Sequence, residues 1–410
     1  MQQLVITIGM ATILIGPTHW YLWKRLVKDT TTGARARRIG AVALVVLAGF
    51  LLAAFVVPQV FGAKASWIVP MVGFGWLVLV LYLLLVLLVL EVPRAVANRT
   101  GARRPAPGRT GCAATAETAV PQPPGAGVPD SGVGPADPSR RLLIARSAAI
   151  FAGLTATTIT AYGMRTALGD PVLKRVRIPL AKLPRALDGY RIALVSDIHL
   201  GPLTGVEHTR RIVRSINGMD PDVIAVVGDL VDGTVAELGG EAAPLAGLRS
   251  RDGAYFVTGN HEYVSGAEQW LVEVARLGMR PLQNERLELR GLTLAGVNDV
   301  TGGPVGAGGP DYGKALDGRD PDLPVVLLAH QPIQAYQAAE HGVDLQLSGH
   351  THGGQLAPFS LIPALQQPIL SGLGEINGTQ VYVTNGAGFA GAPVRVGAPP
   401  DITLVELRTR

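Results

Sequence analysis

Five short blocks of metal-binding residue types, each placed directly after a short apolar run, constrain this chain more than any other feature. The blocks are Asp197-Ile198-His199, Gly228-Asp229-Leu230-Val231-Asp232, Gly259-Asn260-His261-Glu262, His330, and Gly349-His350-Thr351-His352-Gly353-Gly354-Gln355. They contain five of the eight histidines in the chain. Imidazoles, carboxylates and a carboxamide gathered at strand ends are typical of a site for two divalent metal ions.

The apolar runs predict the strands of an α/β domain that begins near Val172. Strands are expected at 191–196, 223–227, 254–258, 324–329, 344–347, 381–384 and 402–407. The spacing of Ile212, Val213 and Ile216 predicts an amphipathic helix over 207–216. Ligands of open α/β sheets bind outside the carboxyl ends of the strands, so we expect the five blocks to meet at one place.

Two blocks hold ligand types two residues apart, Asp197 with His199 and His350 with His352. If these segments are extended, both side chains of each pair point to the same side and reach one cavity. Glycines beside the ligands permit tight turns and a close approach of the backbone to an ion or a phosphate.

In this order, the five blocks resemble those of the calcineurin-like metallophosphoesterase superfamily, and the last block resembles its branch of membrane-tethered bacterial phosphoesterases. The resemblance covers about residues 190–407 and implies a four-layer α/β sandwich of two mixed β-sheets flanked by helices. It implies a first metal ion held by Asp197, His199, Asp229 and His352. It implies a second ion held by Asp229, Asn260, His330 and His350. Asp229 then bridges the ions, and His261 matches the residue that contacts the phosphoryl oxygen or protonates the leaving group.

Oxygen and imidazole ligands without sulfur suit Mn, Fe, Zn or Co, and two such ions activate a hydroxide that attacks phosphorus. We therefore expect a metal-dependent hydrolase of a phosphate monoester, diester or pyrophosphate, with a lipid or cell-envelope compound as a candidate substrate. A non-catalytic metal-dependent scaffold on the same fold is the alternative. Asp232 matches a supporting position or is a turn residue. The candidates for the substrate pocket are Asp232, Gln355, Asn385 and Arg395.

Other motifs have plainer interpretations. His208 and His341 stand alone and are expected to be packed or surface residues. The segment 302–309 is rich in glycine but lacks the Lys-Ser/Thr of a P-loop, so we interpret it as a flexible loop. The single cysteine, Cys112, excludes an intramolecular disulfide and a thiolate metal site.

The amino-terminal part is too apolar for an ordinary soluble chain, and the mean hydropathy of the whole chain is +0.30. Four apolar stretches run over Leu4–Trp23, Ala41–Val57, Trp67–Val92 and Ala148–Tyr162. The fourth is rich in Ala and Thr and also fits an amphipathic or buried soluble helix. The predicted organisation is transmembrane helices 1–3 within 1–100, a disordered Pro/Gly/Ala linker over 101–140, a fourth transmembrane or signal-anchor helix over 141–165, and the metallophosphoesterase domain over 172–410.

Basic residues predict the orientation in the membrane. Residues 1–164 hold 15 Lys and Arg, and 14 of these lie in two alternate loops, 24–38 and 94–146. These loops should be cytoplasmic, which makes the chain a multi-pass protein of the cell membrane with an extracytoplasmic catalytic domain. If the fourth stretch does not span, the domain is cytoplasmic instead.

Two features beside the apolar stretches keep two interpretations each. Ser139-Arg140-Arg141-Leu142-Leu143 resembles a twin-arginine export signal or is ordinary cytoplasmic charge. His19, near the end of the first stretch, is an intramembrane proton or metal site or part of an aromatic belt. Residues 165–410 carry 21 basic and 26 acidic residues, so nucleic-acid binding is not expected.

Overall fold

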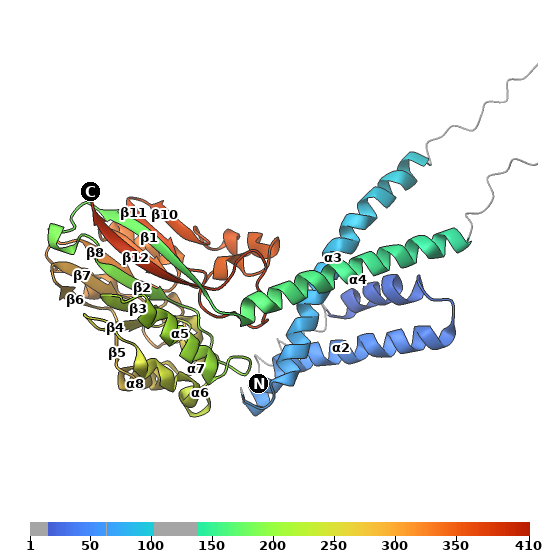
Figure 1. Ribbon diagram of the computed structural model, residues 1–410, viewed down its shortest axis with the longest axis horizontal. Coiled ribbons are helices and arrows are strands. Elements are labelled where there is room, and N and C mark those ends of the chain that lie inside the picture. The colour runs from blue at the N-terminus through green and yellow to red at the C-terminus, as the bar shows by residue number, and fades with distance from the viewer. Residues whose placement is uncertain (1–14, 63, 102–137) are drawn as a thin grey trace, which may run out of the picture.

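The computed structural model describes residues 15–62, 64–101 and 138–410. Part of the predicted stretch Leu4–Trp23 and nearly all of the predicted linker 101–140 therefore lie outside the described residues. Figure 1 shows two parts, an α/β sandwich built from residue 172 onward and a group of long helices beside it. The long helices are α2 (Ala34–Phe61), α3 (Ile68–Gly101) and α4 (Pro138–Leu168), preceded by a helical segment that ends in a π-helical turn at Trp23–Lys28.

The sandwich contains two six-stranded sheets. The first sheet has, in spatial order, β1 (Val172–Leu180), β12 (Asp401–Thr409), β2 (Arg191–Val195), β3 (Val223–Val227), β4 (Ala254–Val257) and β5 (Met279–Pro281). The second has β10 (Gly372–Ile376), β11 (Thr379–Val383), β9 (Leu345–Ser348), β8 (Val325–Leu328), β7 (Leu292–Gly296) and β6 (Glu285–Leu289). The helices are α5 (Val206–Gly218), α6 (Val235–Ala242), α7 (Asn260–Ser265), α8 (Ala267–Arg276), α9 (Tyr312–Leu316) and α10 (Ala335–Glu340). Short 3₁₀ turns complete the domain at Arg185–Leu187, Ala243–Gly247, Val300–Gly302, Pro332–Gln334, His352–Gly354, Phe359–Leu361 and Pro363–Leu365.

Both sheets are mixed, as the resemblance implies. In the first sheet, β2, β3, β4 and β5 are parallel neighbours, whereas β12 runs antiparallel to β2. In the second, β7, β8, β9 and β11 are parallel, and β6 and β10 pair antiparallel with its outer members. Parallel strands buried on both faces are continuous hydrophobic runs, which is why Val223–Val227 was readable from the sequence and is wholly buried.

Three apolar clusters separate the layers. One lies between the two sheets and combines residues such as Val227 of β3 and Leu328 of β8. A second lies under α5, α6 and α8, and a third lies under α9 and α10. The order is therefore helix, sheet, sheet, helix, and the predicted four-layer sandwich is confirmed. The predicted helix over 207–216 is α5, and its apolar face is buried.

The long helices expose apolar side chains instead of burying them. Among the described residues, three helices are long and apolar enough to cross a membrane, over Ala34–Pro58, Ile68–Val92 and Leu142–Leu168. The third contains the predicted stretch Ala148–Tyr162. Ile150, Phe151 and Leu154 within it are each more than half exposed, which excludes a buried soluble helix. These helices associate the protein with a membrane.

The helices pack on the sandwich at the loops around the last sequence block. Tyr82 of α3 donates a hydrogen bond to the carbonyl of Ala357 over 2.8 Å. The backbone N–H of Arg395 donates to the carbonyl of Gly163 in α4 over 2.9 Å. A Cβ on Gly163 would lie 2.5 Å from Val394, so α4 approaches this loop as closely as a glycine allows. The membrane part and the loops of the candidate site therefore form one packed unit.

His19 is packed among the membrane helices. It is 9% exposed, and its Nε2 accepts a hydrogen bond from the Trp76 indole over 2.8 Å. Its Nδ1 lies 2.9 Å from the carbonyl of Ile15. Because both ring nitrogens have partners, the role of His19 is to hold the first helical segment against α3.

Candidate metal centre

The five sequence blocks meet where the carboxyl ends of the two sheets adjoin. Asp197, Asp229 and Asn260 follow β2, β3 and β4 of the first sheet, and His330 and His350 follow β8 and β9 of the second. Among the described residues, three groups of side chains have ligand atoms within 4.8 Å of one another. The groups are Asp197, His199 and His352; His199, Asp229 and His261; and Asp229, His330 and His350. The expectation that the blocks share one place is confirmed.

Asp229 lies between the imidazoles. Its Oδ2 is 3.1 Å from Nε2 of His330 on one side and 3.9 Å from Nε2 of His199 on the other. His199 Nε2 lies 3.1 Å from His352 Nε2, which in turn is 3.4 Å from Oδ1 of Asp197. Two groups thus share the Asp229 carboxylate, and a third adjoins them through His199.

The backbone of the site is left-handed at the ligand positions. Asp197, His199, Asp229, His350 and His352 all have φ between 49° and 71°. Non-glycine residues rarely adopt this conformation, and they do so at sites that the surrounding structure holds in place. The explanation of the Asp197/His199 and His350/His352 pairs by extended segments is therefore wrong. Sharp left-handed turns, not strand alternation, direct both members of each pair into the site.

Two glycines allow the strand ends to come together. A Cβ on Gly228 would lie 2.6 Å from the backbone nitrogen of Gly259, and a Cβ on Gly259 would lie 2.2 Å from Oδ1 of Asp229. No side chain fits in either place. The loops after β3 and β4 are therefore in backbone contact directly beneath Asp229.

Hydrogen bonds on the far side of each ring orient the imidazoles. Nδ1 of His330 lies 2.9 Å from the carbonyl of Val227 and donates to it, so Nε2 points into the cluster. That Nε2 makes no hydrogen bond of acceptable geometry within the described chain, despite its proximity to Asp229. The buried Oδ1 of Asn260 also has no partner among the described residues. Buried polar atoms without a hydrogen-bond partner beside carboxylates fit divalent metal ions, as does the N/O donor set.

Burial and neighbouring charges shift the pKa values of the ligand residues. Burial opposes ionisation of Asp229, but His330 and His199 hold its pKa well below the usual range. Burial and the neighbouring His330 lower the pKa of His350 to about 4. Burial and the Arg395 guanidinium likewise hold the pKa of His352 well below its usual value. Both histidines of the last block are therefore neutral, the form in which imidazole binds a metal.

His261 is set apart from the ligands by its partner. Its Nδ1 lies 2.7 Å from Oδ1 of Asp232, and the same oxygen lies 2.8 Å from Nδ1 of His199. Burial opposes protonation of His261, but Asp232 and Asp229 raise its pKa to about 9. Asp232 therefore orients two rings at once, which is the supporting position and not merely a turn.

The other three candidates for the substrate pocket are used in holding loops. Gln355 exchanges hydrogen bonds with the backbone of Ala390, and the Asn385 side chain donates to Pro399 and accepts from Ser371. Arg395 is fully buried. Its guanidinium donates to the carbonyls of Gly388, Asn385 and His352 and lies 2.8 Å from Nδ1 of His352.

Glu262 belongs to the site but had no role in the sequence analysis. It is fully buried, and its carboxylate accepts hydrogen bonds from the backbone N–H groups of Gly259, Asp229 and Leu230. Burial and the charge of Asp229 raise its pKa to about 7. The signal was present, since Glu262 is the third residue of α7 and caps its amino end. Glu262 clamps the β3 and β4 loops that present Asp229 and Asn260.

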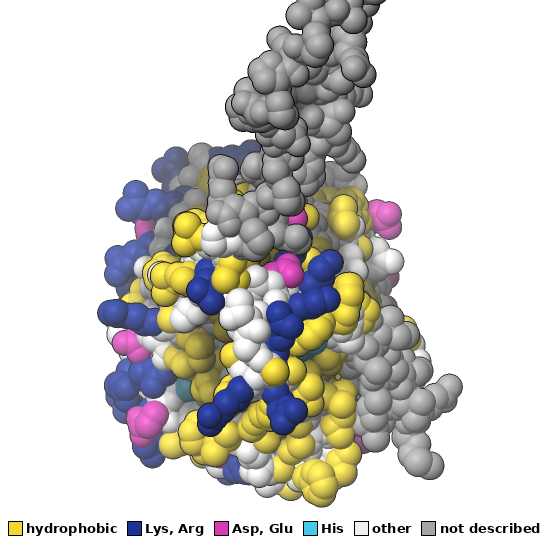
Figure 2. All heavy atoms as spheres, turned by 90° about the vertical axis from the view of Figure 1, so that its right-hand side faces the viewer, with side chains coloured by type: hydrophobic (Ala, Val, Ile, Leu, Met, Phe, Trp, Pro, Cys, Tyr) yellow, Lys and Arg dark blue, Asp and Glu magenta, His cyan; other side chains and the backbone are white. Residues whose placement is uncertain are grey.

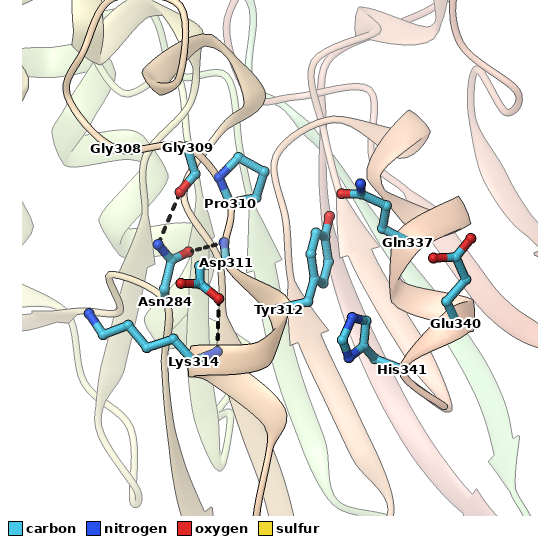
Figure 3. A pocket seen from close by; sticks show the side chains of 10 residues that line it. All are labelled: Asn284, Gly308, Gly309, Pro310, Asp311, Tyr312, Lys314, Gln337, Glu340 and His341. Atoms are coloured by element: carbon cyan, nitrogen blue, oxygen red, sulfur yellow. Dashed lines mark hydrogen bonds between the residues drawn. The ribbon is translucent and has the colours of Figure 1, made fainter.

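A cavity of about 590 Å³ lies away from the metal centre, and none of the residues that line it belongs to the metal groups. Figure 3 shows its lining, with Tyr312 and His341 on one side and Asn284 and Asp311 on the other. Asn284 and Asp311 hold the backbone at Gly309, Asp311 and Lys314. His341 stacks against Tyr312 with ring centroids 5.6 Å apart. These side chains stabilise the loop after the glycine-rich segment.

The part of the chain that holds these residues is similar to known proteins. A family model described as calcineurin-like phosphoesterase matches residues 190–354, which contain the first four blocks and all of the last except Gln355. A metallophosphoesterase of Aquifex aeolicus is 33% identical over 241 residues, which cover 58% of this chain and 91% of that protein.

Two further relatives are longer than the match. A bovine (Bos taurus) protein described as a transmembrane protein with metallophosphoesterase domain is 37% identical over 292 residues, covering 67% of this chain and 65% of the relative. A metallophosphoesterase of Helicobacter pylori is 40% identical over 247 residues, covering 60% of this chain and 66% of the relative. The chain thus spans slightly less than two thirds of the length of these two relatives.

Proposed function

Because this chain belongs to the calcineurin-like metallophosphoesterase family, we propose that it is a membrane-tethered, metal-dependent phosphoric ester hydrolase. One observation carries the proposal. The Asp229 carboxylate lies within 4 Å of both His199, which follows a strand of the first sheet, and His330, which follows a strand of the second. A carboxylate between two cations is the arrangement that brings two divalent ions close enough to act on one phosphoryl group.

The ligand assignment is the one that the family resemblance implies. Two of the observed groups supply three members of each set: Asp197, His199 and His352 for one, and Asp229, His330 and His350 for the other. One ion would be held by Asp197, His199, Asp229 and His352, and the other by Asp229, Asn260, His330 and His350. When bound, the ions supply an acidified water and neutralise charge on the phosphoryl oxygens of a phosphate monoester, diester or pyrophosphate. Glu262 and Asp232 keep the ligands in position from behind.

His261 is the residue that faces substrate in this proposal. Its backbone N–H is bound to Asp229 Oδ1 over 2.9 Å, and its ring is fixed by Asp232, so Nε2 has a defined direction. With Nδ1 held by a carboxylate, the ring can carry a proton on Nε2. It would donate that proton to a phosphoryl oxygen or to the leaving oxygen.

The helix ends support an extracytoplasmic location of the domain. The amino ends of α2 and α4 and the carboxyl end of α3 lie away from the sandwich, whereas the α2–α3 connection lies beside it (Figure 1). Figure 2 looks onto the distant end and shows Lys and Arg side chains gathered there. Arg35, Arg37 and Arg38 at this end are exposed, and Arg146 donates to the carbonyl of Thr30. Basic ends face the cytoplasm, so the catalytic domain would lie outside in a multi-pass protein.

The reaction is tested with the purified full chain. After chelation and addition of Mn²⁺, it is expected to hydrolyse an aryl phosphate ester. Asp229→Asn should lower kcat/KM by about 10³-fold or more, because an amide cannot bring negative charge between two cations. Asp222→Asn is the matched control, since Asp222 lies at the amino end of the same strand, β3, and binds Arg191 and Arg251. Activity that survives chelation or Asp229→Asn contradicts the proposal.

The location is tested by labelling intact cells with a membrane-impermeant maleimide. Val272 on α8 is 72% exposed, so Val272→Cys in a Cys112→Ser background gives a single accessible thiol on the catalytic domain. The unaltered chain carries only Cys112, within the predicted cytoplasmic linker. Labelling at position 272 but not at 112 is expected, and the reverse pattern contradicts the orientation.

A further inference from the structure

A cavity of about 330 Å³ joins the candidate metal centre to the ends of the membrane helices. His199, Asp232 and His261 line it on one side, and Phe55, Pro58 and Phe74 of α2 and α3 line it on another. We infer that the substrate is a phosphoester carried on a hydrocarbon chain, a lipid phosphate of the adjoining leaflet, whose chain occupies this cavity. This inference rests on the proposed hydrolase function and names its substrate class.

The helix wall lies at the depth where the apolar spans end. Pro58 is the last residue of one candidate span, and Pro70 lies two residues inside the next. Phe55 and Phe74 contact each other edge to face, with ring centroids 5.2 Å apart. A Cβ on Gly73 would lie 2.4 Å from the carbonyl of Phe50, so α2 and α3 are in close contact behind this pair. A lipid whose headgroup lies at the membrane surface is therefore level with the cavity.

The opposite wall belongs to the catalytic domain and is also apolar. It contains Pro202, Leu203, Val264 and Phe389. Val264 lies three residues after His261 and is 86% exposed. A hydrophobic side chain this exposed beside a candidate active site is explained when a hydrocarbon chain covers it.

The polar atoms of the cavity wall are already bonded. Among the described residues that line the cavity, only Thr204 and Ser265, besides the three site residues, contribute side chains that can form hydrogen bonds. The Thr204 hydroxyl donates to the carbonyl of His199 and accepts from the N–H of Gly201. The Ser265 hydroxyl donates to the carbonyl of Val231. A nucleoside or sugar buried here would leave its own polar groups unpaired, whereas a hydrocarbon chain would not.

The test uses n-alkylphosphonates, which carry a phosphoryl head and cannot be hydrolysed, as inhibitors of aryl phosphate hydrolysis. The full chain is held in phosphatidylcholine nanodiscs with Mn²⁺. From ethyl- to octylphosphonate, the inhibition constant should fall by up to about fourfold per buried methylene, the equivalent of about 0.8 kcal/mol. Equal constants across the series overturn the inference.

A pair of exposed valines separates cavity binding from simple partitioning into the nanodisc. Val264 lines the cavity and Val272 does not, and both are exposed on neighbouring helices. Val264→Gln should lower the preference for octyl- over ethylphosphonate by about tenfold. Val272→Gln should leave the preference unchanged. If both variants behave alike, the cavity is not the binding place. If the unaltered chain hydrolyses no aryl phosphate, the proposed function itself fails.

Discussion

The two sheets contribute different chemistry to one site. The first sheet presents carboxylates, a carboxamide and one imidazole, from Asp197, Asp229, Asn260 and His199, whereas the second presents only imidazoles, from His330, His350 and His352. A hydrogen bond links the ligands of the two sheets, because the backbone N–H of His350 donates to the Asp197 carboxylate over 3.0 Å. Neither sheet alone holds a complete ligand set. The apolar cluster between the sheets therefore determines the geometry of the site as much as the ligands do.

Among changes to the second sheet, the largest effect is expected from removing an imidazole that faces Asp229. His330→Ala deletes the ring whose Nε2 faces Asp229 and should remove one of the two ions. The expected loss in kcat/KM is more than about 10²-fold, above the range that residues behind the ligands usually cost. Elemental analysis of the purified chain, together with aryl phosphate kinetics, measures both quantities.

His341→Ala is the matched control for this change. His341 also lies on the side of the second sheet, but it stacks against Tyr312 and belongs to none of the metal groups. It should keep both ions and the activity. If His330→Ala retains two ions, the division of ligands between the sheets is wrong.

A smaller effect is expected behind the second sheet. Arg395→Met removes the guanidinium that holds the loop and ring of His352, and should weaken metal binding by about 10–100-fold. Arg395→Lys keeps the charge but not the fork of donors, so it should recover only part of the affinity. Metal titration distinguishes this from a purely structural role, which would lower stability and leave the affinity of the folded chain unchanged.

The strands that carry the site could be predicted from the sequence because they are buried on both faces. Predicted and observed bounds of β3 are identical, and those of β2, β4 and β8 differ by two residues or fewer. Edge strands were not individually predicted, since β6 and β10 are only partly buried and alternate weakly. The candidate ligands could be predicted from the sequence as well, because each block directly follows one of these buried apolar runs.

What could not be predicted depends on contacts between distant segments. The left-handed turns at Asp197 and His350 arise from loop packing and have no local signature in a non-glycine residue. Arg395, a candidate for the substrate pocket in the sequence, is instead fully buried and contacts His352. The contacts of α3 and α4 with the loops at Ala357 and Arg395 join residues far apart in the chain, so no local sequence pattern predicts them.

A histidine outside the site sharpens the contrast between packed and ligating imidazoles. His208 on α5 is buried over the first sheet, and its Nε2 has no partner within the described chain. Burial and Arg211 lower its pKa to about 4, against a small opposing effect of Asp170. The unfolded chain therefore binds a proton near pH 6.5 that the folded chain does not bind until about pH 4. Its stabilising contribution is complete above pH 6.5 and is lost as the pH falls toward 4.

His208→Leu removes this proton uptake. Between pH 7.5 and pH 5, the unaltered chain should lose about 2 kcal/mol more unfolding free energy than the variant. Denaturant unfolding of the detergent-solubilised chain at both pH values measures the difference. Equal pH dependence in the two chains would mean that His208 is solvated or finds a partner at low pH.

The smallest effect, that of Lys64→Ala, is expected where the membrane helices contact the two halves of the sandwich. Lys64 pairs with Glu241 of α6 over 2.8 Å on the side of the first sheet, and the lysine side chain is half exposed. Lys64→Ala should lower the free energy of unfolding by no more than about 1 kcal/mol, since exposed ion pairs contribute little and are screened by salt.

On the side of the second sheet, the Tyr82 hydroxyl is buried against the carbonyl of Ala357. Tyr82→Phe leaves that carbonyl unpaired and should cost about 1–3 kcal/mol. Thermal unfolding in low and high salt compares the stability of the two variants. If Lys64→Ala loses more stability than Tyr82→Phe, and the loss depends on salt, the catalytic domain is held on the membrane helices by the side of the first sheet. The loops beside the imidazoles would then not be the main contact.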